Sequence, residues 1–476
     1  MRVLLINPPR HSEIVSDNPP FIDEERGSNP PLGILYIAAY LKRYSNHQIF
    51  ALDAQVEKLD YAEKFRMRIK EINPDVVGIT VMTFTLIDVI KTIKIVREAE
   101  KELYKKIVVV LGGPHAYLYP EETISLNGVD FVIKGEGEVP FYRLLNALEE
   151  KEEFSKVPGL TYWQNSKIID NQVSDLIDNL DELPFPDRTI LPIEKYNSIL
   201  GRDHIVTTMF TSRGCPFKCA FCDRPHLGKK FRARSAHNVV DEIEECLRYG
   251  IQEILIYDDT FTINRQRAVD ICDEIIERGL DFVWDIRARV DTVDEEILKK
   301  LKKAGCIRIH FGVEAGTDKI LKVLNKGINL KQVEYAFKIA NKLGIETLAY
   351  FMIGSPTETK KDILQTIKFA KKIKPNYTHI TILTPFPATK IYFQALKEKV
   401  IKNDYWCEFA KNPENGVITQ YWDKELSKEE LFYLLDKFYK DFYGRPLYIV
   451  KQILKIRSYN DLSKRILTGL KILGLK

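Results

Sequence analysis

The chain has 476 residues, enough for about three domains at roughly 150 residues each, so a single small module is excluded. Hydrophobic residues make up 45% and charged residues 29%, which predicts a packed globular protein and excludes extended disorder or a collagenous fibre. Lys and Arg exceed Asp and Glu by 71 − 67 = 4 charges, too few to indicate a nucleic-acid partner. No long apolar run occurs, and the apolar stretch in MRVLLINPPR is too short for a signal peptide, which predicts a cytoplasmic protein.

The first 150 residues alternate apolar runs with helical patterns, which predicts a Rossmann-like open sheet of parallel strands joined by right-handed crossovers. The expected strands cover residues 2–6, 48–52, 76–80, 107–111 and 131–134. Each strand ends in a polar or Gly/Pro loop, and in open α/β sheets the loops at the carboxyl ends form the ligand crevice. The candidate crevice residues are Asp53, Thr80, Thr83, Gly112, Gly113, His115, Gly135, Glu136 and Glu138.

Residues 151–202 predict a connection between domains, with a short hairpin over 159–169 and a Pro-punctuated stretch over 183–187. From 203 to 400 the β/α alternation resumes and predicts a full or partial parallel barrel, whose chemistry belongs on the loops at the strand carboxyl ends. The expected barrel strands lie near 205–211, 253–257, 282–287, 307–313, 348–353 and 379–383. Residues 401–476 predict a helical carboxyl-terminal region.

The last forty residues combine basic and aliphatic residues at helical spacing. Such a segment can lie on an anionic membrane surface as a basic amphipathic helix. It can also be a cap helix packed on the barrel with a solvated charged face, which the frequency of such surface helices favours. The basic residues are Arg445, Lys451, Lys455, Arg457, Lys464, Arg465 and Lys471.

Seven cysteines in a chain of this length argue against a disulfide scaffold. Cys246, Cys272, Cys306 and Cys407 are scattered, whereas Cys215, Cys219 and Cys222 share one loop with CxxxCxxC spacing. Three thiolates can bind three irons of a 4Fe-4S cubane and leave one iron open to a small chelating molecule, such as a methionine moiety.

Two alternatives to an iron-sulfur cluster remain open for this loop. His226 follows Cys222 at CxxxH spacing, so Cys3His ligation of a structural zinc is conceivable. Zinc knuckles usually staple small domains rather than occupy a barrel strand end, which disfavours zinc here. Unligated thiols are disfavoured further, because three of them within eight residues would be prone to oxidation.

The CxxxCxxC loop, with the aromatic Phe221 before its third cysteine, resembles the signature of radical S-adenosylmethionine (SAM) enzymes. Segments after the later barrel strands are similar to that family's cofactor-contacting segments, at 258–261, 289, 312–316 and 354–358. The amino-terminal sheet, with its Asn-Pro-Pro, Pro-Pro-Leu-Gly and Gly-Gly-Pro-His loops, resembles the cobalamin-binding domain joined to these barrels. The resemblance covers about residues 1–390.

This resemblance implies three cofactors, namely a 4Fe-4S cluster on the three cysteines, SAM and cobalamin. Phe221 would pack near the adenine, and Glu314 would accept hydrogen bonds from the ribose hydroxyls. The backbone of Gly354, Ser355 and Pro356 would approach the adenine, because Gly and Pro leave it uncrowded. The charged methionine end would be handled by Asp258, Asp259 and Arg289. For each acid, a solvated strand end or a helix N-cap is the alternative.

The sequence evidence for cobalamin is less specific. The DxHxxG motif that supplies a lower-ligand histidine is absent, because His11 lacks the Asp two before it and the Gly three after it. Its absence fits the cobalamin-binding radical family, whose members commonly lack that histidine. His115 is the nearest crevice histidine, and a lone histidine is more often a hydrogen-bonded loop residue than a metal ligand. The glycines at 112–113 and in 135–138 allow close approach of a macrocycle or serve as ordinary turns, and the missing GxGxxG disfavours a dinucleotide.

The leading functional hypothesis is therefore a cobalamin-dependent radical SAM enzyme that methylates an unactivated carbon. The same architecture without methyl transfer, catalysing cyclisation, ring contraction or coupling, is the nearest alternative. A non-catalytic metal-stabilised binding protein is another, and an RNA-modifying enzyme is third because no nucleic acid is favoured. The expected partners are a small-molecule or lipid-like substrate and an electron donor such as ferredoxin or flavodoxin, with peripheral membrane contact through the carboxyl-terminal helices as an option.

Overall fold

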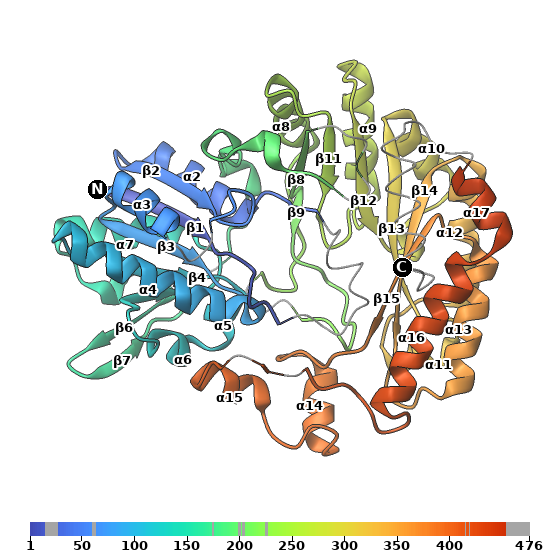
Figure 1. Cartoon of the computed structure of the whole chain (residues 1–476). Coiled ribbons are helices and arrows are strands. Elements are labelled where there is room, and N and C mark those ends of the chain that lie inside the picture. Colours follow the sequence, from blue (N-terminus) through green and yellow to red (C-terminus); the bar gives the residue numbers. More distant parts are fainter. Residues whose placement is uncertain are drawn as a thin grey trace.

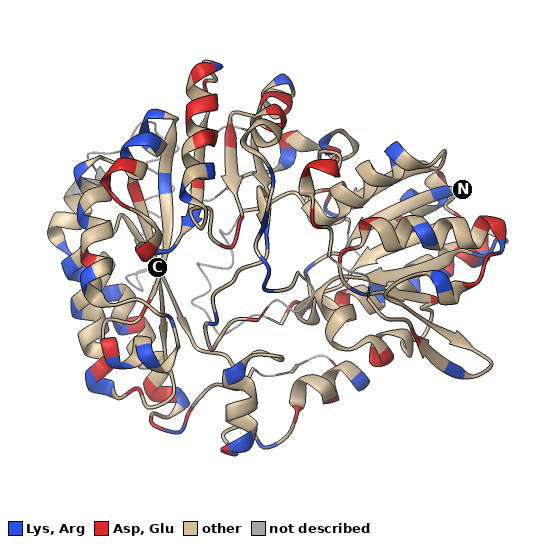
Figure 2. Ribbon diagram, turned by 180° about the vertical axis from the view of Figure 1, so that it is seen from behind, with Lys and Arg blue, Asp and Glu red and all other residues tan. Residues whose placement is uncertain are grey.

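The computed structural model describes residues 1–14, 27–59, 63–173, 176–198, 201, 205–223, 227–414, 416–417 and 419–453. Two sheets lie side by side, each covered by helices, and helices α16 (Lys428–Tyr443) and α17 (Pro446–Ile453) pack at the far edge of the second sheet (Figure 1). This arrangement confirms the predicted fold class, an open Rossmann-like sheet followed by a barrel and a helical region. Charged residues of both signs are interspersed over the outer helices, as the small net charge leads one to expect (Figure 2).

The first sheet has the order β2-β1-β3-β4-β5-β6-β7. Its strands are β1 (Arg2–Asn7), β2 (Gln48–Asp53), β3 (Val76–Thr80), β4 (Val108–Gly112), β5 (Phe131–Ile133), β6 (Leu160–Gln164) and β7 (Lys167–Asp170). Its helices are α2 (Leu32–Tyr44), α3 (Glu63–Ile72), α4 (Leu86–Leu103), α5 (Pro114–Leu118), α6 (Pro120–Ile124) and α7 (Glu138–Glu150). Strand β1 is apolar on both faces because α2 and α7 bury Val3 and Leu5, while α3 and α4 bury Leu4 and Ile6.

The hairpin expected within the connection is part of this sheet. Strand β6 pairs antiparallel with β5, with Phe131 opposite Tyr162, and β7 pairs with β6. The hairpin therefore continues the parallel sheet with two antiparallel strands and covers the edge that β5 would otherwise leave open. Sequence periodicity identified the hairpin but could not assign its pairing partner.

The second sheet is a partial barrel with the order β15-β14-β13-β12-β11-β8. Its strands are β8 (Val206–Met209), β11 (Glu253–Ile256), β12 (Val283–Ala288), β13 (Cys306–Glu314), β14 (Glu346–Ile353) and β15 (Tyr377–Ile382). The helices outside it are α8 (Ala236–Arg248), α9 (Arg265–Glu277), α10 (Glu295–Lys303), α11 (Asp318–Val323), α12 (Leu330–Lys342) and α13 (Lys360–Ile373). A two-residue pair, β9 (Ser212–Arg213) and β10 (Arg232–Ala233), brackets the cysteine loop.

The carboxyl-terminal region contains α14 (Lys390–Lys397), α15 (Tyr405–Lys411), α16 (Lys428–Tyr443) and α17 (Pro446–Ile453). Helix α16 packs along β15, which agrees with the cap-helix interpretation for the described part of the tail. The basic residues Lys455, Arg457, Lys464, Arg465 and Lys471 lie outside the described residues, as does the side chain of Lys451. Across the described ranges, no helix is both long and apolar enough to cross a bilayer.

Tyrosine hydroxyls bind the outer edge of β15. The hydroxyl of Tyr439 donates to the carbonyl of Ile380 at 3.0 Å and accepts from the Ile380 amide at 3.0 Å. Tyr443 makes the same pair of bonds with Thr378, at 2.8 and 2.9 Å. Tyr448 donates to the carbonyl of Asn376 at 2.9 Å. Side chains from α16 and α17 therefore satisfy the backbone groups that an edge strand leaves without a ladder partner.

Candidate functional site

The cysteine loop starts where β8 ends, and a buried carboxylate fixes its first residues. Asp258 accepts four hydrogen bonds of 2.5 to 3.0 Å, from the backbone amides and the hydroxyls of Thr211 and Ser212. Asp258 is completely buried. This carboxylate, which sequence similarity associated with the methionine end of SAM, is thus occupied in orienting the loop. Its neighbour Asp259 is half-buried after the end of β11.

The three cysteines of the loop carry free thiols, with Cys215 and Cys219 partly buried and Cys222 exposed. Burial raises the pKa of Cys215, whereas the positive charge of Arg289 opposes that rise. The guanidinium of Arg289 lies 3.9 Å from the sulfur of Cys219. A set of three soft sulfur donors beside a cation fits a polynuclear iron-sulfur cluster with one open iron. Within the described ranges no three Cys, His, Asp or Glu side chains are grouped to hold a single metal ion, and His226 lies outside those ranges.

Arg289 is held in place from several sides. Its guanidinium lies 3.8 Å from the ring centre of Phe217 in the cysteine loop. It pairs with Asp291, with both nitrogen-oxygen distances at 2.9 Å, and donates to the carbonyl of Lys326 at 2.8 Å. The structure therefore brings Arg289 to the cysteine loop, and its expected role at the methionine end of SAM stays a prediction.

A segment after α11 that sequence analysis missed also holds the cysteine loop. The amide of Ala220 donates to the carbonyl of Leu324 at 2.8 Å, and the side-chain amide of Asn325 donates to the carbonyl of Lys218 at 2.6 Å. These residues belong to no recognisable motif, and the contacts join positions more than one hundred residues apart. Only the tertiary fold shows that they support the loop.

Glu314 stands at the end of β13 in a left-handed backbone conformation with φ of 70°. Its carboxylate pairs with the ammonium group of Lys326 at 2.6 Å, and both side chains are buried. A Cβ atom at Gly312 would lie 2.5 Å from the Glu314 carboxylate and 2.7 Å from the Lys326 nitrogen, so this pair requires a glycine there. Lys326 also lies 5.7 Å from the ring centre of Phe221, which brings Phe221 and Glu314, both expected at the SAM site, to the same lysine.

The loop after β14 combines a glycine turn with buried polar atoms. Gly354 has φ of 80°, and a Cβ there would lie 3.1 Å from the side chain of Leu431 in α16. The amide of Ser355 donates to the Glu358 carboxylate at 2.9 Å. Among the described residues, the Ser355 hydroxyl and the other carboxylate oxygen of Glu358 have no hydrogen-bond partner. Buried polar atoms without partners fit a loop that a polar ligand completes, and the neighbouring Pro356 is also buried.

Glu358 supplies a pH-dependent prediction, because burial raises its pKa from 4.5 to about 7. Between these two values the folded chain binds this proton more tightly than the unfolded chain, so the free energy of unfolding falls as pH rises through that range. Glu358→Gln removes the titration. We expect the variant to gain about 1 to 3 kcal/mol over the native chain between pH 5 and pH 8, measured by urea unfolding.

Asp362 provides a control of opposite sign. The ammonium of Lys319 and the backbone of Thr359 hold the pKa of Asp362 below its usual range, outweighing its partial burial. Asp362→Asn should therefore lose stability relative to the native chain as pH rises up to the ordinary carboxyl range, and the loss should stay constant above it. Parallel stability curves for the Glu358 and Asp362 variants would contradict the assignment of a raised pKa to Glu358.

At the amino-terminal sheet, two predicted crevice residues are enclosed by the fold. Asp53 is buried and accepts from the side-chain amide of Asn7 at 2.9 Å and from the Tyr196 hydroxyl at 2.9 Å. His115 is completely buried, with its Nδ1 3.0 Å from the hydroxyl of Thr83. Burial lowers the pKa of His115 to about 3, so its ring is neutral. The structure therefore places His115 behind the crevice surface and in the loop role that a lone histidine most often has.

Two of the crevice glycines are required by close packing. Gly113 has φ of 122°, and a Cβ there would lie 2.7 Å from the carbonyl of Val81. Gly135 has φ of 83°, and a Cβ would lie 2.9 Å from Val173. Gly112 has only the Ile133 carbonyl within 4 Å of such an atom, at 3.7 Å, and Thr80 is half-buried at the same sheet edge. Of the predicted crevice glycines, Gly112 thus has the most space around its backbone, and Thr80 pairs with it in the sheet.

Glu136 and Glu138 join the two sheets. Arg213 of β9 binds Glu136 at 2.7 Å and Glu138 at 2.6 Å, and Arg232 of β10 binds Glu136 at 2.9 Å. Burial would raise the pKa of Glu136, but the charges and hydrogen bonds of Arg213 and Arg232 outweigh it and keep the pKa low. The loop after β5 is therefore ion-paired directly to the strands that bracket the cysteine loop.

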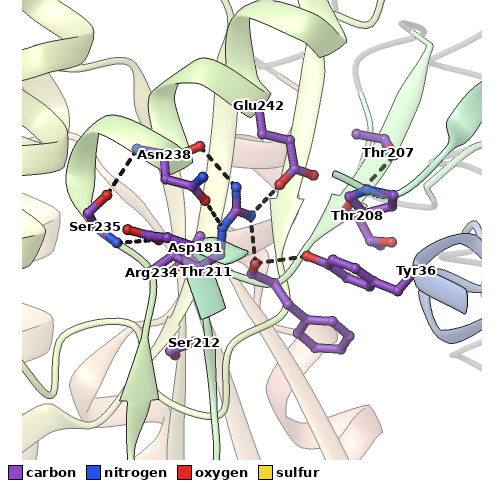
Figure 3. A network of polar contacts seen from close by, with 12 residues as sticks. Tyr36, Asp181, Thr207, Thr208, Thr211, Ser212, Arg234, Ser235, Asn238 and Glu242 are labelled. Carbon is purple, nitrogen blue, oxygen red and sulfur yellow. Dashed lines mark hydrogen bonds and ion pairs between the residues drawn. The ribbon is translucent and has the colours of Figure 1, made fainter. Parts of the chain in front are cut away.

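A second buried network ties α2 and the connection to the barrel (Figure 3). Glu242 of α8 binds Arg234 on one carboxylate oxygen and Arg188, at 2.6 Å, on the other. The carbonyl of Phe210 accepts from Arg234 at 3.1 Å and from the Tyr36 hydroxyl at 3.5 Å. Burial would raise the pKa of Glu242, but the charges of Arg234 and Arg188 outweigh it and lower the pKa. Together the two networks fix the position of the amino-terminal sheet against the start of the cysteine loop.

Comparison with known proteins identifies one family for the barrel and another for the amino-terminal sheet. Residues 209–370 match the radical SAM superfamily, and residues 22–145 match the B12 binding domain. An uncharacterised methyltransferase of Pyrococcus horikoshii is 35% identical, with 99% of this chain and 98% of that protein covered. The anaerobic magnesium-protoporphyrin IX monomethyl ester cyclase of Rubrivivax gelatinosus is 31% identical, with 85% of this chain and 72% of that protein covered.

Among solved structures, the cobalamin-dependent SAM radical enzyme OxsB, with aqua-cobalamin and SAM bound, superimposes with a TM-score of 0.75. It is 18% identical, and the match covers 99% of this chain and 71% of OxsB, which shows a shared fold. The sequence relatives extend over nearly the whole chain and over both cofactor-binding halves. The chain therefore belongs to the cobalamin-dependent radical SAM enzymes, whose cofactors are a 4Fe-4S cluster, SAM and cobalamin.

Proposed function

We propose that this enzyme methylates an unactivated carbon of a small-molecule substrate, with the cluster bound by Cys215, Cys219 and Cys222. The observation that carries the proposal is the direct ion pairing of Arg213, next to the cysteine loop, with Glu136 and Glu138. This pairing joins the carboxyl edge of the amino-terminal sheet to the carboxyl end of the barrel. Both cofactor-binding edges then face one space, as transfer between two cofactors and one substrate requires.

The residues around the cysteine loop have distinct roles in this proposal. Asp258 orients the loop, and Arg289 stabilises negative charge on the sulfur of Cys219. Lys326 holds Glu314, which would bind the ribose hydroxyls of SAM, beside Phe221, which would contact the adenine. Asp259 would bind the amino group of the methionine end, and the buried backbone of Gly354, Ser355 and Pro356 would lie against the adenine.

For cobalamin, we propose contact through the open backbone near Thr80 and Gly112. Asp53, Thr83, Gly113, Gly135 and His115 would shape the loops behind that surface rather than bind the corrin through their side chains. Glu136 and Glu138 would act by holding the two sheets together. His115, being fully enclosed, would not serve as an axial ligand.

When bound, the cofactors supply a hydrogen-abstracting radical and a methyl group, so each methylation consumes two SAM molecules and two electrons. The products are the methylated substrate, methionine, 5′-deoxyadenosine and S-adenosylhomocysteine. The electrons would come from a small donor protein such as ferredoxin or flavodoxin. The protein side chains described above would orient these groups and exclude competing water.

Product analysis of the anaerobically purified holoenzyme tests the proposal. With a competent substrate and a chemical reductant, we expect 5′-deoxyadenosine and S-adenosylhomocysteine in equal amounts and a substrate heavier by one CH2 unit. Formation of 5′-deoxyadenosine without S-adenosylhomocysteine would refute methyl transfer and retain radical chemistry. Formation of neither, from a protein with full cluster and corrin spectra, would refute the proposal as a whole.

A second candidate is radical ring formation without methyl transfer. The 31% identity to a cyclase that acts on a magnesium porphyrin ester favours retaining it. Product mass separates the two candidates, since cyclisation removes hydrogen and methylation adds a carbon. The stoichiometry of S-adenosylhomocysteine provides an independent check.

A further inference from the structure

The barrel presents a row of half-buried polar side chains to its axis. On β13 and β14, Phe311 packs against α12 through Phe337, and Phe351 packs against α16 through Phe438, so these side chains face outward. The alternate residues face the axis. The half-buried axis-facing residues of β12 to β15 include Arg287, His310, Tyr350 and His379. Barrel interiors are usually filled by branched apolar side chains, so a polar, partly exposed row indicates a place for a ligand.

Arg287 supplies a guanidinium to this row, and its charge acts on Asp285 by helping to lower the pKa of that carboxyl. Its guanidinium lies 3.6 Å from the ring centre of Tyr257, and its charge acts on the hydroxyl of Tyr350 against the pKa rise that burial causes there. No carboxylate of the described residues lies within 4.0 Å of it. Removing a charge from water is costly unless an opposite charge compensates it. The guanidinium is therefore suited to an anion that is brought in from outside.

The acids nearest to Arg287 are bound to other groups. Asp285, two residues earlier on β12, lies 3.3 Å from a guanidinium nitrogen of Arg308 and 3.3 Å from Nε2 of His310. The second nitrogen of the His310 ring lies 3.1 Å from the Tyr350 hydroxyl. Arg308 also lies 3.3 Å from Glu346. These contacts orient Asp285, His310 and Tyr350, whereas the guanidinium of Arg287 lies against the ring of Tyr257.

The strand register gives the distance from Arg287 to the cofactor end. Arg287 pairs with His310 on β13, and Arg289, which touches the cysteine loop, is two residues further along the chain. Two residues of a strand span about 7 Å, or several carbon-carbon bonds. A substrate whose charged end reaches Arg287 would thus present a carbon several bonds away to the cofactor end.

We infer that the substrate is an acid, and that Arg287 binds its carboxylate or phosphate in the barrel while Tyr257 and Tyr350 flank the bound group. The inference rests on the proposed function and deepens it by naming the class of substrate. A guanidinium binds a carboxylate or a phosphate through two parallel hydrogen bonds, which a lysine at the same position cannot reproduce. The anchor fixes which carbon is presented, so Arg287 is a specificity-determining residue.

Binding of simple anions to the reconstituted holoenzyme tests this inference. Benzoate and phenyl phosphate are the probes, and benzyl alcohol is the uncharged control, with affinities measured by titration calorimetry. We expect Arg287→Gln to weaken binding of both anions by about 10- to 100-fold, as expected for loss of charged hydrogen bonds, and Arg287→Lys to recover part of it. Preference for phenyl phosphate would assign a phosphate ester, and preference for benzoate a carboxylic acid.

A matched control is Arg43→Gln, because Arg43 also lies over a tyrosine ring, Tyr44, but on the exposed surface of α2. This variant should bind both anions as the native enzyme does. Equal binding of benzoate and benzyl alcohol, or full anion binding by a folded Arg287→Gln variant, would overturn the inference. Formation of 5′-deoxyadenosine without substrate is measured in the same samples, so a loss of radical chemistry is distinguished from a loss of anion binding.

Discussion

Cys219→Ala is expected to lose the cluster and to lower 5′-deoxyadenosine formation by more than about a hundredfold. Substitutions of residues that only support metal ligands usually lower activity by about 10- to 100-fold, so loss of a ligand should exceed that range. Two remaining thiolates on the loop cannot hold three irons, and Arg289, 3.9 Å from the Cys219 sulfur, would lose the negative partner that its position serves. Iron and sulfide content per chain and the product yield under anaerobic conditions are the measurements.

Cys407→Ala is the matched control, because Cys407 is also half-buried and its sulfur lies 3.6 Å from a carboxylate oxygen of Glu122, outside the cysteine loop. This variant should retain full iron, sulfide and activity. Native protein that contains about one zinc and no sulfide would contradict the cluster assignment and favour the structural zinc that the His226 spacing allows.

Glu242→Ala is expected to destabilise the enzyme by about 3 to 5 kcal/mol, because it leaves two buried cations without their common partner. Arg188 and Arg234 are both within a few per cent of full burial and share the Glu242 carboxylate. Figure 3 shows the Arg234 side of this contact. Arg188 also donates to the Thr207 hydroxyl and to the Thr208 carbonyl, so it cannot turn outward without losing further bonds. The measurement is the urea midpoint of the anaerobic holoenzyme.

Glu274→Ala serves as the comparison for the Glu242 variant, since Glu274 binds Arg278 and His237 on the outer surface. Glu274 and Arg278 are half-buried rather than enclosed, and ion pairs at the surface contribute about 1 kcal/mol or less. Equal losses of stability in the two variants would contradict the prediction, because they would show that the buried Glu242 ion pairs contribute no more to the free energy of unfolding than the surface pairs of Glu274. Glu242→Gln, which keeps the hydrogen-bonding shape but removes the charge, should fall between the native chain and the alanine variant.

Local sequence patterns were sufficient for most of the fold. The strands of both sheets are short apolar runs with distinct ends. A continuous apolar run such as VLLI in β1 is typical of a parallel strand that is buried on both faces. The cysteine loop was identifiable because three thiols in eight residues have few chemical uses. The same local patterns could not give the pairing of β6 with β5, since strand pairing depends on which edge is open in three dimensions.

The supporting contacts of the site could not be predicted, because they join distant segments. Lys326 meets Glu314 only through the turn after α11, and Arg213 meets Glu136 only when the two sheets dock. The loop with Glu136 predicts a crevice residue but not this ion pair, since a polar strand-end loop has the same appearance whether it binds a ligand or another domain. Arg287 was overlooked for a different reason, although the alternation of β12 would have placed it on the axis.

The tyrosine hydroxyls along β15 have a consequence for how the chain can be altered. A barrel with six strands has a free flank, and such a flank recruits strands from other molecules. Here Tyr439 and Tyr443 occupy that flank from within the same chain. A shortened form that ends before α16 would keep all three cysteines and every predicted SAM contact. It would, however, expose the unpaired backbone groups of β15, and we expect it to self-associate through that edge. Helix α16 therefore protects the barrel sheet against intermolecular strand pairing, in addition to packing on it.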